Sequence, residues 1–467
     1  MLNYKKFILF PLIFLFLPAF CIPAGALSSF FPLYNLALLI FFVLFGIVNI
    51  KNITVTVSSF TRNTAFNYFF IFIIWCIFTD ILFLITGNLS IGKVLYSLIV
   101  IIAGYYIMYS LYPLFLTKVF NSKTIYKVIV FSIWLILIWG ILYYIGILFN
   151  IPVIKIIASF ICNKHSLQRG VTEQLIARNK SVFTEPGFYG YFLNLNILLT
   201  YQVSKSKYKL FENKYLNKII KLTIFPLTII SLISTFSPIN IVFAMFIGII
   251  CLLKQKSKYK ISIILTLIIF LFLSFQIPIV KNSTPITRIE KTFASFSNFE
   301  ELSTEESSLY TRISSYINTF CLFIKHPVVG VGTGMSKYYM AKQFEESPVP
   351  LSHENYLKMK IGEISGVTGF NLSIFTTILA ETGIIGFCLL YLYFYLTIKQ
   401  LKKIQKYSNG LDFDIISSLI PTMYIMLFLS VYESFLINSP YTFLIFIFAN
   451  SLYLKKLKIF NKGKRNA

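Results

Sequence analysis

The sequence predicts an all-α polytopic membrane protein with about twelve transmembrane helices and one large extracytoplasmic loop that carries amphipathic helices. The chain is 57% hydrophobic and 18% aromatic but only 13% charged, whereas soluble domains are roughly 25% charged. Apolar runs of about 17 to 25 residues recur along most of the chain, and each is long enough to cross a hydrocarbon core of roughly 30 Å as a helix.

These runs define the expected spans. They are residues 7–26, 30–49, 66–86, 94–116, 127–149, 187–203, 218–236, 238–253, 261–280, 373–397, 414–433 and 440–455. The first run follows two lysines and ends at Ala24-Gly25-Ala26, so it fits either a span or a cleaved signal peptide. We expect a span, because its removal would reverse the charge balance of the remaining loops.

The basic residues predict the orientation. Of 42 lysines and arginines, 27 lie in the termini and in the loops that follow even-numbered spans, whereas the four short loops on the other side together hold only Lys93. Basic residues collect on the cytoplasmic side of membrane proteins, so both termini are expected in the cytoplasm. The net charge of +25 thus reflects topology. Its small scattered clusters argue against nucleic-acid binding.

The loops divide the chain into three expected regions. Residues 1–280 hold nine transmembrane helices and the outer loop 150–186, residues 281–372 form the large extracytoplasmic loop, and residues 373–467 hold three more helices and a basic cytoplasmic tail. The other 14 basic residues all lie in the two long outer loops. Long loops usually carry function or are disordered, so the site is expected there.

Arginines are concentrated in these two loops. The chain has only six, and four of them are Arg169, Arg178, Arg288 and Arg312. The planar guanidinium grips phosphate or carboxylate in a bidentate way. Ion pairs with neighbouring glutamates on a solvated surface are the alternative for each arginine.

Two segments of the loops have a recognisable pattern. In residues 177–192, Arg178, Lys180 and Glu185 precede Pro186-Gly187 at the start of a span, and proline suits a helix start. In the second segment, apolar residues recur at helical spacing between 309 and 324, which indicates an amphipathic helix on the bilayer.

Pro327 and three glycines, Gly330, Gly332 and Gly334, follow that helix. Their spacing fits neither a dinucleotide fingerprint nor a Walker loop. A flexible turn remains, which reverses the chain or lets its backbone approach a ligand closely. No Cys/His spacing indicates a metal site, and no cofactor is expected.

The order of these motifs resembles the O-antigen polymerase and O-antigen ligase superfamily. The motifs are Arg178 with Glu185-Pro186-Gly187, then Ser308 to Arg312 with Pro327 to Gly334, then Ala-Glu-Thr-Gly-Ile-Ile-Gly at 380–386. The motifs cover roughly residues 175 to 390, and the topology carries the resemblance elsewhere. The resemblance implies a metal-independent glycosyltransferase of the bacterial inner membrane. Its substrate would be a glycan on undecaprenyl diphosphate, at the outer face.

Two branches of the superfamily differ in the acceptor. A polymerase transfers the growing glycan to the next lipid-linked repeat unit of an O-antigen, capsule or exopolysaccharide, sometimes with a chain-length regulator protein as partner. A ligase transfers it to lipid A core in lipopolysaccharide. The histidine expected of the family would fall at Asn371 or Leu372, and neither is histidine. This departure favours the polymerase branch.

The resemblance also implies roles for individual residues. Loop cations would bind the diphosphate, here Arg178 and Arg312 with Lys180 and Arg288 behind them. The base would be His353, or else Glu185. The site would be shaped by Gly330, Gly332, Gly334, Asn355, Asn371 and Glu381.

Two further expectations concern the helices. Asp80 lies inside a span, where an acidic residue is costly unless it is paired or near the interface, so an intramembrane function is expected. The alternative is that it reaches a water-filled groove for sugar. Glu381 is expected near an outer helix end, as an anchor or as a partner that supports a site residue. A transporter or lipid-linked oligosaccharide flippase would have a similar number of helices, but such proteins usually show internal repeats and broken helices. The two halves of this chain show no matching pattern.

Overall fold

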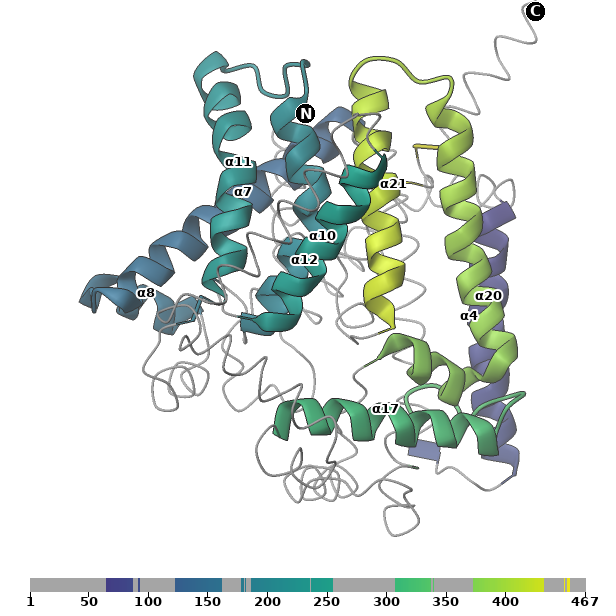
Figure 1. The fold of residues 1–467 in the computed structure, drawn as a ribbon. Coiled ribbons are helices and arrows are strands. Elements are labelled where there is room, and N and C mark those ends of the chain that lie inside the picture. Colours follow the sequence, from purple (N-terminus) through teal and green to yellow (C-terminus); the bar gives the residue numbers. More distant parts are fainter. Residues whose placement is uncertain are drawn as a thin grey trace, which may run out of the picture. The chain divides into compact units, whose positions relative to one another are not determined.

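The computed structural model describes residues 64–86, 91–92, 122–161, 178–179, 181, 186–235, 237–254, 307–336, 339, 373–431, 449 and 452–453. The helices in these residues are α4 (Thr64–Ile85), α7 (Ser122–Leu148), α8 (Pro152–Ile161), α10 (Pro186–Lys205), α11 (Lys214–Ser234), α12 (Pro238–Lys254), α17 (Ser307–Lys325), α20 (Ile374–Gln405) and α21 (Leu411–Ser430) (Figure 1). No strand occurs in the described residues, so the prediction of an all-helical protein is confirmed.

Seven of the expected spans coincide with helices: α4, α7, α10, α11, α12, α20 and α21. Within the described part of the chain, five helices are long and apolar enough to cross a membrane, namely α4, α7, α11, α20 and α21. The other five expected spans lie outside the described residues, apart from three positions in 440–455. The same holds for most of the large loop and for its boundaries at 280 and 372. Helix α8 lies within the expected outer loop 150–186, where the sequence analysis predicted no helix.

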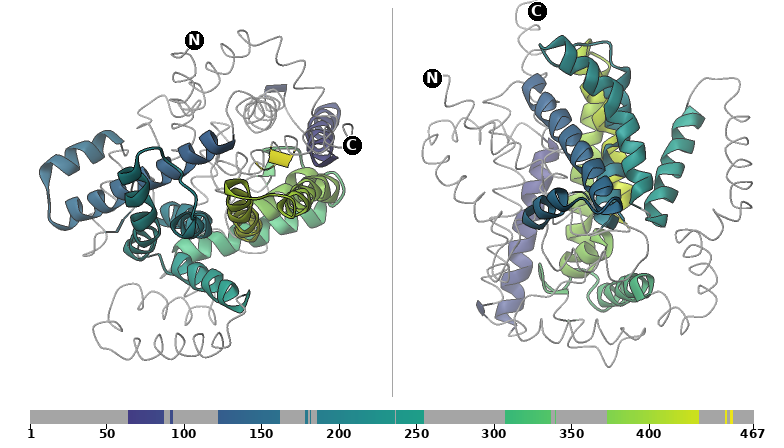
Figure 2. Two further views of the ribbon diagram at one scale, coloured as in Figure 1. Left: turned by 90° about the horizontal axis from the view of Figure 1, so that it is seen from above. Right: turned by 90° about the vertical axis from the view of Figure 1, so that its left-hand side faces the viewer.

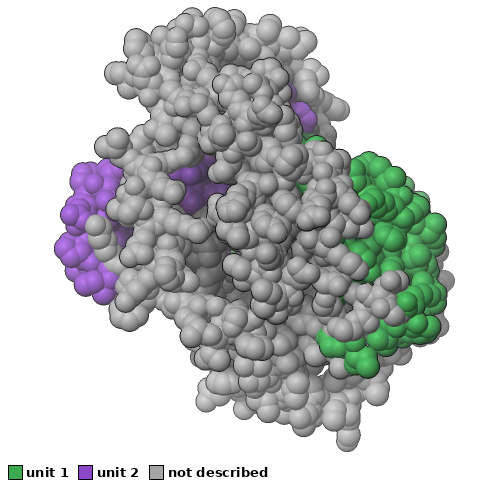
Figure 3. Space-filling model, turned by 90° about the horizontal axis from the view of Figure 1, so that it is seen from below, with its two compact units in different colours: residues 1–18, 26–129, 310–467 green, residues 19–25, 130–309 purple. Residues whose placement is uncertain are grey.

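The chain forms two compact units (Figure 3). Unit 1 comprises residues 1–18, 26–129 and 310–467, and unit 2 comprises residues 19–25 and 130–309. The division falls within α7, whose first turns belong to unit 1 and whose remainder belongs to unit 2.

In unit 1, α20 packs along α4 and α21 follows α20 in a hairpin (Figures 1 and 2). Aromatic side chains fill the contact between α4 and α20, where the rings of Phe69 and Tyr393 lie 4.8 Å apart and both residues are fully buried. Such ring pairs add about 0.5–1.5 kcal/mol beyond the area that they bury. Helix α17 runs crosswise to α20 (Figure 1).

The amphipathic helix expected in the large loop is α17. Its predicted apolar stripe faces outward, because Phe320 and Ile324 are exposed. The buried face consists mainly of small polar residues: Ser314, Ser315, Asn318 and Thr319. The exposed part of the stripe is thus Phe320 and Ile324, whereas Ile313 and Ile317 are partly buried and the polar side packs against the protein.

The span expected at 373–397 coincides with α20, but the helix has a break that the sequence did not indicate. Helix α20 changes direction at Gly383, whose φ of 64° and ψ of −171° are not helical. Backbone of this kind is essentially restricted to glycine. The apolar run did not indicate the break, because hydropathy carries no information on a single dihedral angle.

Unit 2 contains α10, α11 and α12, and its helices meet through polar side chains. Asn194 Nδ2 donates to Asn240 O at 2.9 Å and to Asn240 Oδ1 at 3.3 Å, which links α10 to α12. Thr228 Oγ1 donates to Thr200 Oγ1 at 3.3 Å, which links α11 to α10. Polar side chains of this kind join helices within membranes.

Candidate functional site

The glycine loop, residues 326–336, lies in unit 1 and follows α17. Gly330, Gly332 and Gly334 have φ values of 75°, 95° and 75°, a region that other residues rarely adopt. Gly330 N donates to His326 O at 3.1 Å and Met335 N donates to Gly332 O at 3.2 Å. The three glycines therefore give the loop its tight internal turns.

The glycine loop is docked into the break in α20. Ile384 N, which would donate to Ala380 O in an uninterrupted helix, donates to Pro327 O at 2.9 Å. Val331 N donates to Ala380 O at 2.9 Å. Gly332 N donates to Glu381 O at 2.9 Å. Backbone polar groups away from water need partners, and the loop supplies partners around the break.

Two glycines make this close approach possible. A Cβ on Gly383 would lie 2.1 Å from Val328 O, and a Cβ on Gly330 would lie 2.3 Å from the backbone carbon of Glu381. No side chain fits at either place. The second and third motifs of the sequence therefore form one interlocked structure, which we call the loop–break junction (residues 326–336 and 380–386).

Side chains from two helices fasten the loop–break junction. Asp80 Oδ1 accepts from Thr333 N at 2.8 Å. Glu381 Oε1 accepts from Ser336 Oγ at 2.6 Å. Trp75 Nε1 donates to Thr382 O at 2.8 Å. Two of these three groups, Asp80 and Trp75, come from α4, so α4 binds both the glycine loop and the residue of α20 directly before the break.

The structure gives a hydrogen-bond partner to both acidic residues. Asp80 is fully buried and bound to the loop backbone, so it does not face an open groove. Glu381 is 5% exposed and lies in α20 close to the break at Gly383, where its partner is Ser336. Both carboxylates thus determine where the glycine loop lies.

In unit 2, Arg178 is attached to the C-terminal end of α11. Its Nε donates to Thr235 O at 3.1 Å. The next residue, Asn179, is fully buried; its N donates to Ser234 O at 2.9 Å and its Nδ2 to Ser234 Oγ at 2.8 Å. The C-terminal end of a helix attracts cations, so this position suits the guanidinium. We call residues 178–181 the Arg178 segment.

Ser181 closes the Arg178 segment. Its φ is 50°, its N donates to Asn179 Oδ1 at 3.0 Å, and its Oγ donates to Ile136 O of α7 at 3.0 Å. Gly140 leaves room for it, because a Cβ there would lie 3.3 Å from Ser181 Cβ. Buried polar contacts thus fix the backbone beside Arg178.

The start of α10, which follows Glu185, is fixed by α12. Asn240 Nδ2 donates to Gly187 O at 3.0 Å and to Ser237 Oγ at 2.8 Å. A Cβ on Gly190 would lie 2.3 Å from Asn240 Nδ2. Both parts of the first motif therefore lie against helix ends: Pro186-Gly187 is held by the start of α12, and Arg178 by the end of α11.

The other predicted site residues are placed only in part. Gly330, Gly332 and Glu381 come together in the loop–break junction, and Gly334 belongs to the same loop with open space beside it. Arg312 lies in α17, but only its backbone is described. The following residues lie outside the described residues: Lys180, Glu185, Arg288, His353, Asn355 and Asn371. Among the described residues, no group of three His, Cys, Asp or Glu side chains could hold a metal ion.

Sequence reasoning missed several residues that shape these segments. Asp80 was noticed because an acidic residue inside a span is unusual, but its partner was not. Asn179 and Asn240 gave no signal, since asparagine is common in loops and at helix starts. Trp75 lies in an apolar run where tryptophan is unremarkable. Only the contacts identify these residues.

The helices and the broken α20 define a helical membrane protein of the polytopic class. Residues 223–391 match a family model described as O-antigen ligase. This match supports the resemblance found in the motifs, and residues 223–391 are similar to the O-antigen polymerase and ligase superfamily. The matched range contains the whole loop–break junction and ends within α20. No curated protein sequence matches the chain.

Proposed function

We propose that the chain polymerises a surface polysaccharide, which can be an O-antigen, a capsule or an exopolysaccharide. It transfers a growing glycan from undecaprenyl diphosphate to the next lipid-linked repeat unit, at the outer face of the bacterial inner membrane and without a metal ion. The superfamily match over the loop–break junction carries this proposal. The apolar helices support a bilayer location, and the distribution of lysines supports the outer face.

The reaction breaks the bond between the anomeric carbon and a phosphate oxygen. Negative charge grows on the diphosphate as it departs, and fixed cations stabilise that charge. Arg178 is our first candidate, because the Thr235 carbonyl and the buried Asn179 fix its position. Arg312, Lys180 and Arg288 are the further candidates from the sequence.

The acceptor hydroxyl must lose a proton as it attacks. A general base contributes roughly 10²- to 10⁴-fold in such steps. His353 is the first candidate and Glu185 the second, both from the sequence. The three glycines of the loop carry no group for this chemistry. We assign the loop the role of fixed backbone beside the substrate, consistent with its attachment to Asp80, Glu381 and α20.

Transfer to lipid A core by a ligase is the second candidate function. The family description itself names a ligase, whereas the missing histidine at Asn371 favours a polymerase. Deletion of the gene separates the two. A polymerase leaves one repeat unit attached to the surface, and a ligase leaves no attached glycan while lipid-linked polymer accumulates. A flippase, the third possibility, would leave repeat units on the cytoplasmic side.

Substitution of the arginines tests the diphosphate role. We expect Arg178→Ala and Arg312→Ala to remain in the membrane but to stop chain growth, so that single repeat units appear at the surface. A normal ladder of long chains from both variants would remove the arginines from this role. Unchanged transfer by purified His353→Ala would likewise remove His353 as the base.

A further inference from the structure

The turn between α10 and α11 carries a dense group of lysines. They are Lys205, Lys207, Lys209, Lys214, Lys218 and Lys221, and Glu212 is the one acidic residue among them. We call residues 205–221 the lysine turn. It belongs entirely to unit 2 and is distinct from the Arg178 segment and from the loop–break junction.

The lysine turn has a defined structure. Lys221 Nζ donates to Ser206 O and to Tyr208 O, both at 2.7 Å. Asn217 Oδ1 accepts from Leu210 N at 2.8 Å, and Leu210 is 1% exposed. Asn213 caps α11 by accepting from the backbone of its first turn. Internal contacts therefore set the shape of the turn, and Lys221 takes part in them.

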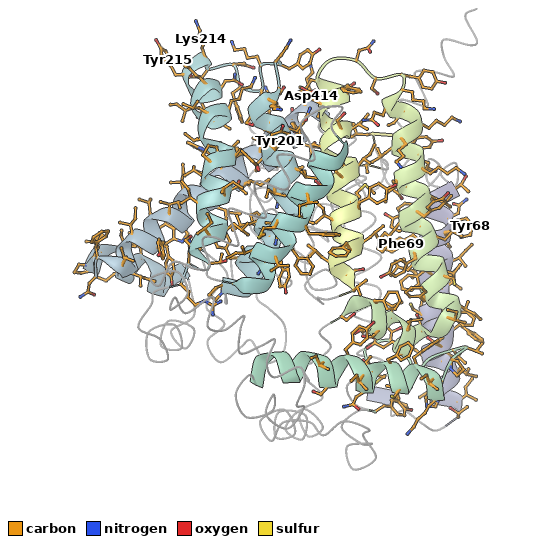
Figure 4. The ribbon with its side chains drawn as sticks, in the orientation of Figure 1. Tyr68, Phe69, Tyr201, Lys214, Tyr215 and Asp414 are labelled. Atoms are coloured by element: carbon orange, nitrogen blue, oxygen red, sulfur yellow. The ribbon has the colours of Figure 1, made fainter. Side chains whose placement is uncertain are left out.

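Of the other five lysines, Lys205 places its Nζ 4.6 Å from the centre of the Tyr201 ring, and four point outward. Lys207, Lys209, Lys214 and Lys218 are exposed, and within the described residues none of them has an acidic partner. Figure 4 shows Lys214 and Tyr215 at the free end of α11. Lys214 and Lys218 also begin a helix without acidic residues in its first turn, where cations are unfavourable next to the helix dipole. Glu212 is thus the one negatively charged residue of the lysine turn.

Two exposed tyrosines lie among these lysines. Tyr208 is 45% exposed and Tyr215 is 79% exposed. Tyrosine and lysine together are typical of the headgroup layer of a membrane. The helix that begins at Lys214 is itself apolar and long enough to span a bilayer. We therefore expect its first turn to lie at the depth of the lipid phosphates.

We propose that the lysine turn binds the phosphates of anionic phospholipids in the cytoplasmic leaflet. Basic clusters directly beside a transmembrane helix attract anionic lipid, and the predicted orientation places this turn in the cytoplasm. Lys207, Lys209, Lys214 and Lys218 supply the charge, and Tyr208 and Tyr215 lie in the headgroup layer. The proposal does not depend on the glycan-transfer function.

The turn between α20 and α21 offers a matched comparison in the same chain. It also carries four lysines, Lys399, Lys402, Lys403 and Lys406, on the same expected side. Two aspartates, Asp412 and Asp414, lie in the first turn of α21, and Lys402 Nζ donates to Tyr424 OH at 2.8 Å. The turn between α20 and α21 therefore has a smaller net positive charge than the lysine turn, and it should bind lipid phosphates more weakly.

Lipid-dependent thermal stability of the full chain tests the proposal. The delipidated protein in a neutral detergent is heated after addition of phosphatidylglycerol or phosphatidylcholine. We expect phosphatidylglycerol to raise the unfolding midpoint more than phosphatidylcholine does. In K207Q/K209Q/K214Q/K218Q, the phosphatidylglycerol concentration for half of this effect should rise at least about tenfold. In K399Q/K402Q/K403Q/K406Q it should change little.

Three results would overturn the proposal. They are equal shifts with the two lipids, an unchanged phosphatidylglycerol response in the lysine-turn variant, and an equal loss in the comparison variant. A shift with polyglutamate as large as that with phosphatidylglycerol would point to an acidic protein partner instead. If the quadruple variant does not fold, the double variant K207Q/K209Q, which leaves α11 intact, gives the same comparison with a smaller shift.

Discussion

Asp80 of α4 accepts a hydrogen bond of 2.8 Å from the backbone N of Thr333, a residue 253 positions later in the chain. Both residues are buried, at 0% and 4% exposure. This contact joins a transmembrane helix to the glycine loop, and the same loop occupies the break in α20. An intramembrane carboxylate thus holds a backbone loop in place.

Removal of the acceptor at Asp80 should destabilise the protein. Asp80→Leu leaves the N–H of Thr333 buried without this partner, which costs about 1–3 kcal/mol. Asp80→Asn keeps an oxygen that can accept the bond, so its loss should be smaller. Unfolding of the detergent-solubilised variants measures both. Ile85→Leu, at a position 76% exposed on the same helix, is the control, and equal stability of all three variants would contradict the role.

Gly383→Ala should be among the most destabilising single changes in α20. The new Cβ would lie 2.1 Å from Val328 O, and the positive φ adds strain of about 1–3 kcal/mol. A lower unfolding midpoint and loss of chain growth are expected together. Gly248→Ala, in α12 with open space around it, should be neutral or slightly stabilising. Similar midpoints for the two variants would be inconsistent with a docked loop.

Trp75→Phe removes the hydrogen bond from Trp75 Nε1 to Thr382 O and keeps an aromatic ring. Trp134→Phe makes the same change in unit 2, where Trp134 Nε1 donates to Thr223 Oγ1 at 2.9 Å. Each of the two substitutions should lower the free energy of unfolding by about 0.5–1.5 kcal/mol. Only Trp75→Phe should shorten the glycan chains, because only Trp75 contacts the loop–break junction. The chain-length distribution on gels measures this, and equal shortening by both variants would argue for a general stability effect.

Asn179→Ala should weaken glycan transfer without removing Arg178. The variant loses the contacts to Ser234 Oγ and to Ser181 N, so the guanidinium loses its fixed position. Small displacements of a substrate-binding group can cost about 10²-fold in rate. Rates measured with membranes of matched protein content provide the readout. Asn196→Ala is the control, since Asn196 is equally buried and bonds within α10. A rate for Asn179→Ala equal to that of this control would reject the positioning role.

The pKa of His326 is lowered, first by burial and then by the neighbouring Lys325. The unfolded chain therefore binds a proton at this position at a higher pH than the folded protein does. Stability is fully present above the ordinary histidine pKa of about 6.5 and falls as the pH drops below it. Unfolding midpoints between pH 7.5 and 5.5 should decline more steeply for the wild type than for His326→Gln. If the unfolding midpoints of the two proteins decline equally with pH, His326 does not contribute to the pH dependence of stability.

The helices could be predicted because they follow from length and hydropathy. The runs at 66–86 and 414–433 coincide with α4 and α21 within a few residues, since a membrane helix satisfies its own backbone and needs only apolar side chains. The break at Gly383 could not be predicted in this way. It depends on partners at Pro327 and Val331, and no local property of the sequence shows them.

The candidate site was predicted by its motifs and not by its contacts. The motifs located Gly330, Gly332 and Glu381, which the structure brings together. They suggested a flexible turn, but the loop is held at several points along its backbone. Contacts between residues far apart in sequence, such as Trp75 with Thr382, arise from packing and leave no spacing pattern in the sequence.

Reconstitution of the purified chain tests the central proposal most directly. The protein is supplied with undecaprenyl-diphosphate-linked repeat units as the one glycan substrate, without divalent metal, and the products are measured by mass spectrometry. We expect lipid-linked glycans of two or more repeats from the wild type and single repeats from Arg178→Ala. Single repeats alone from the folded wild type, or elongation only after lipid A core is added, would contradict the assignment as a polymerase.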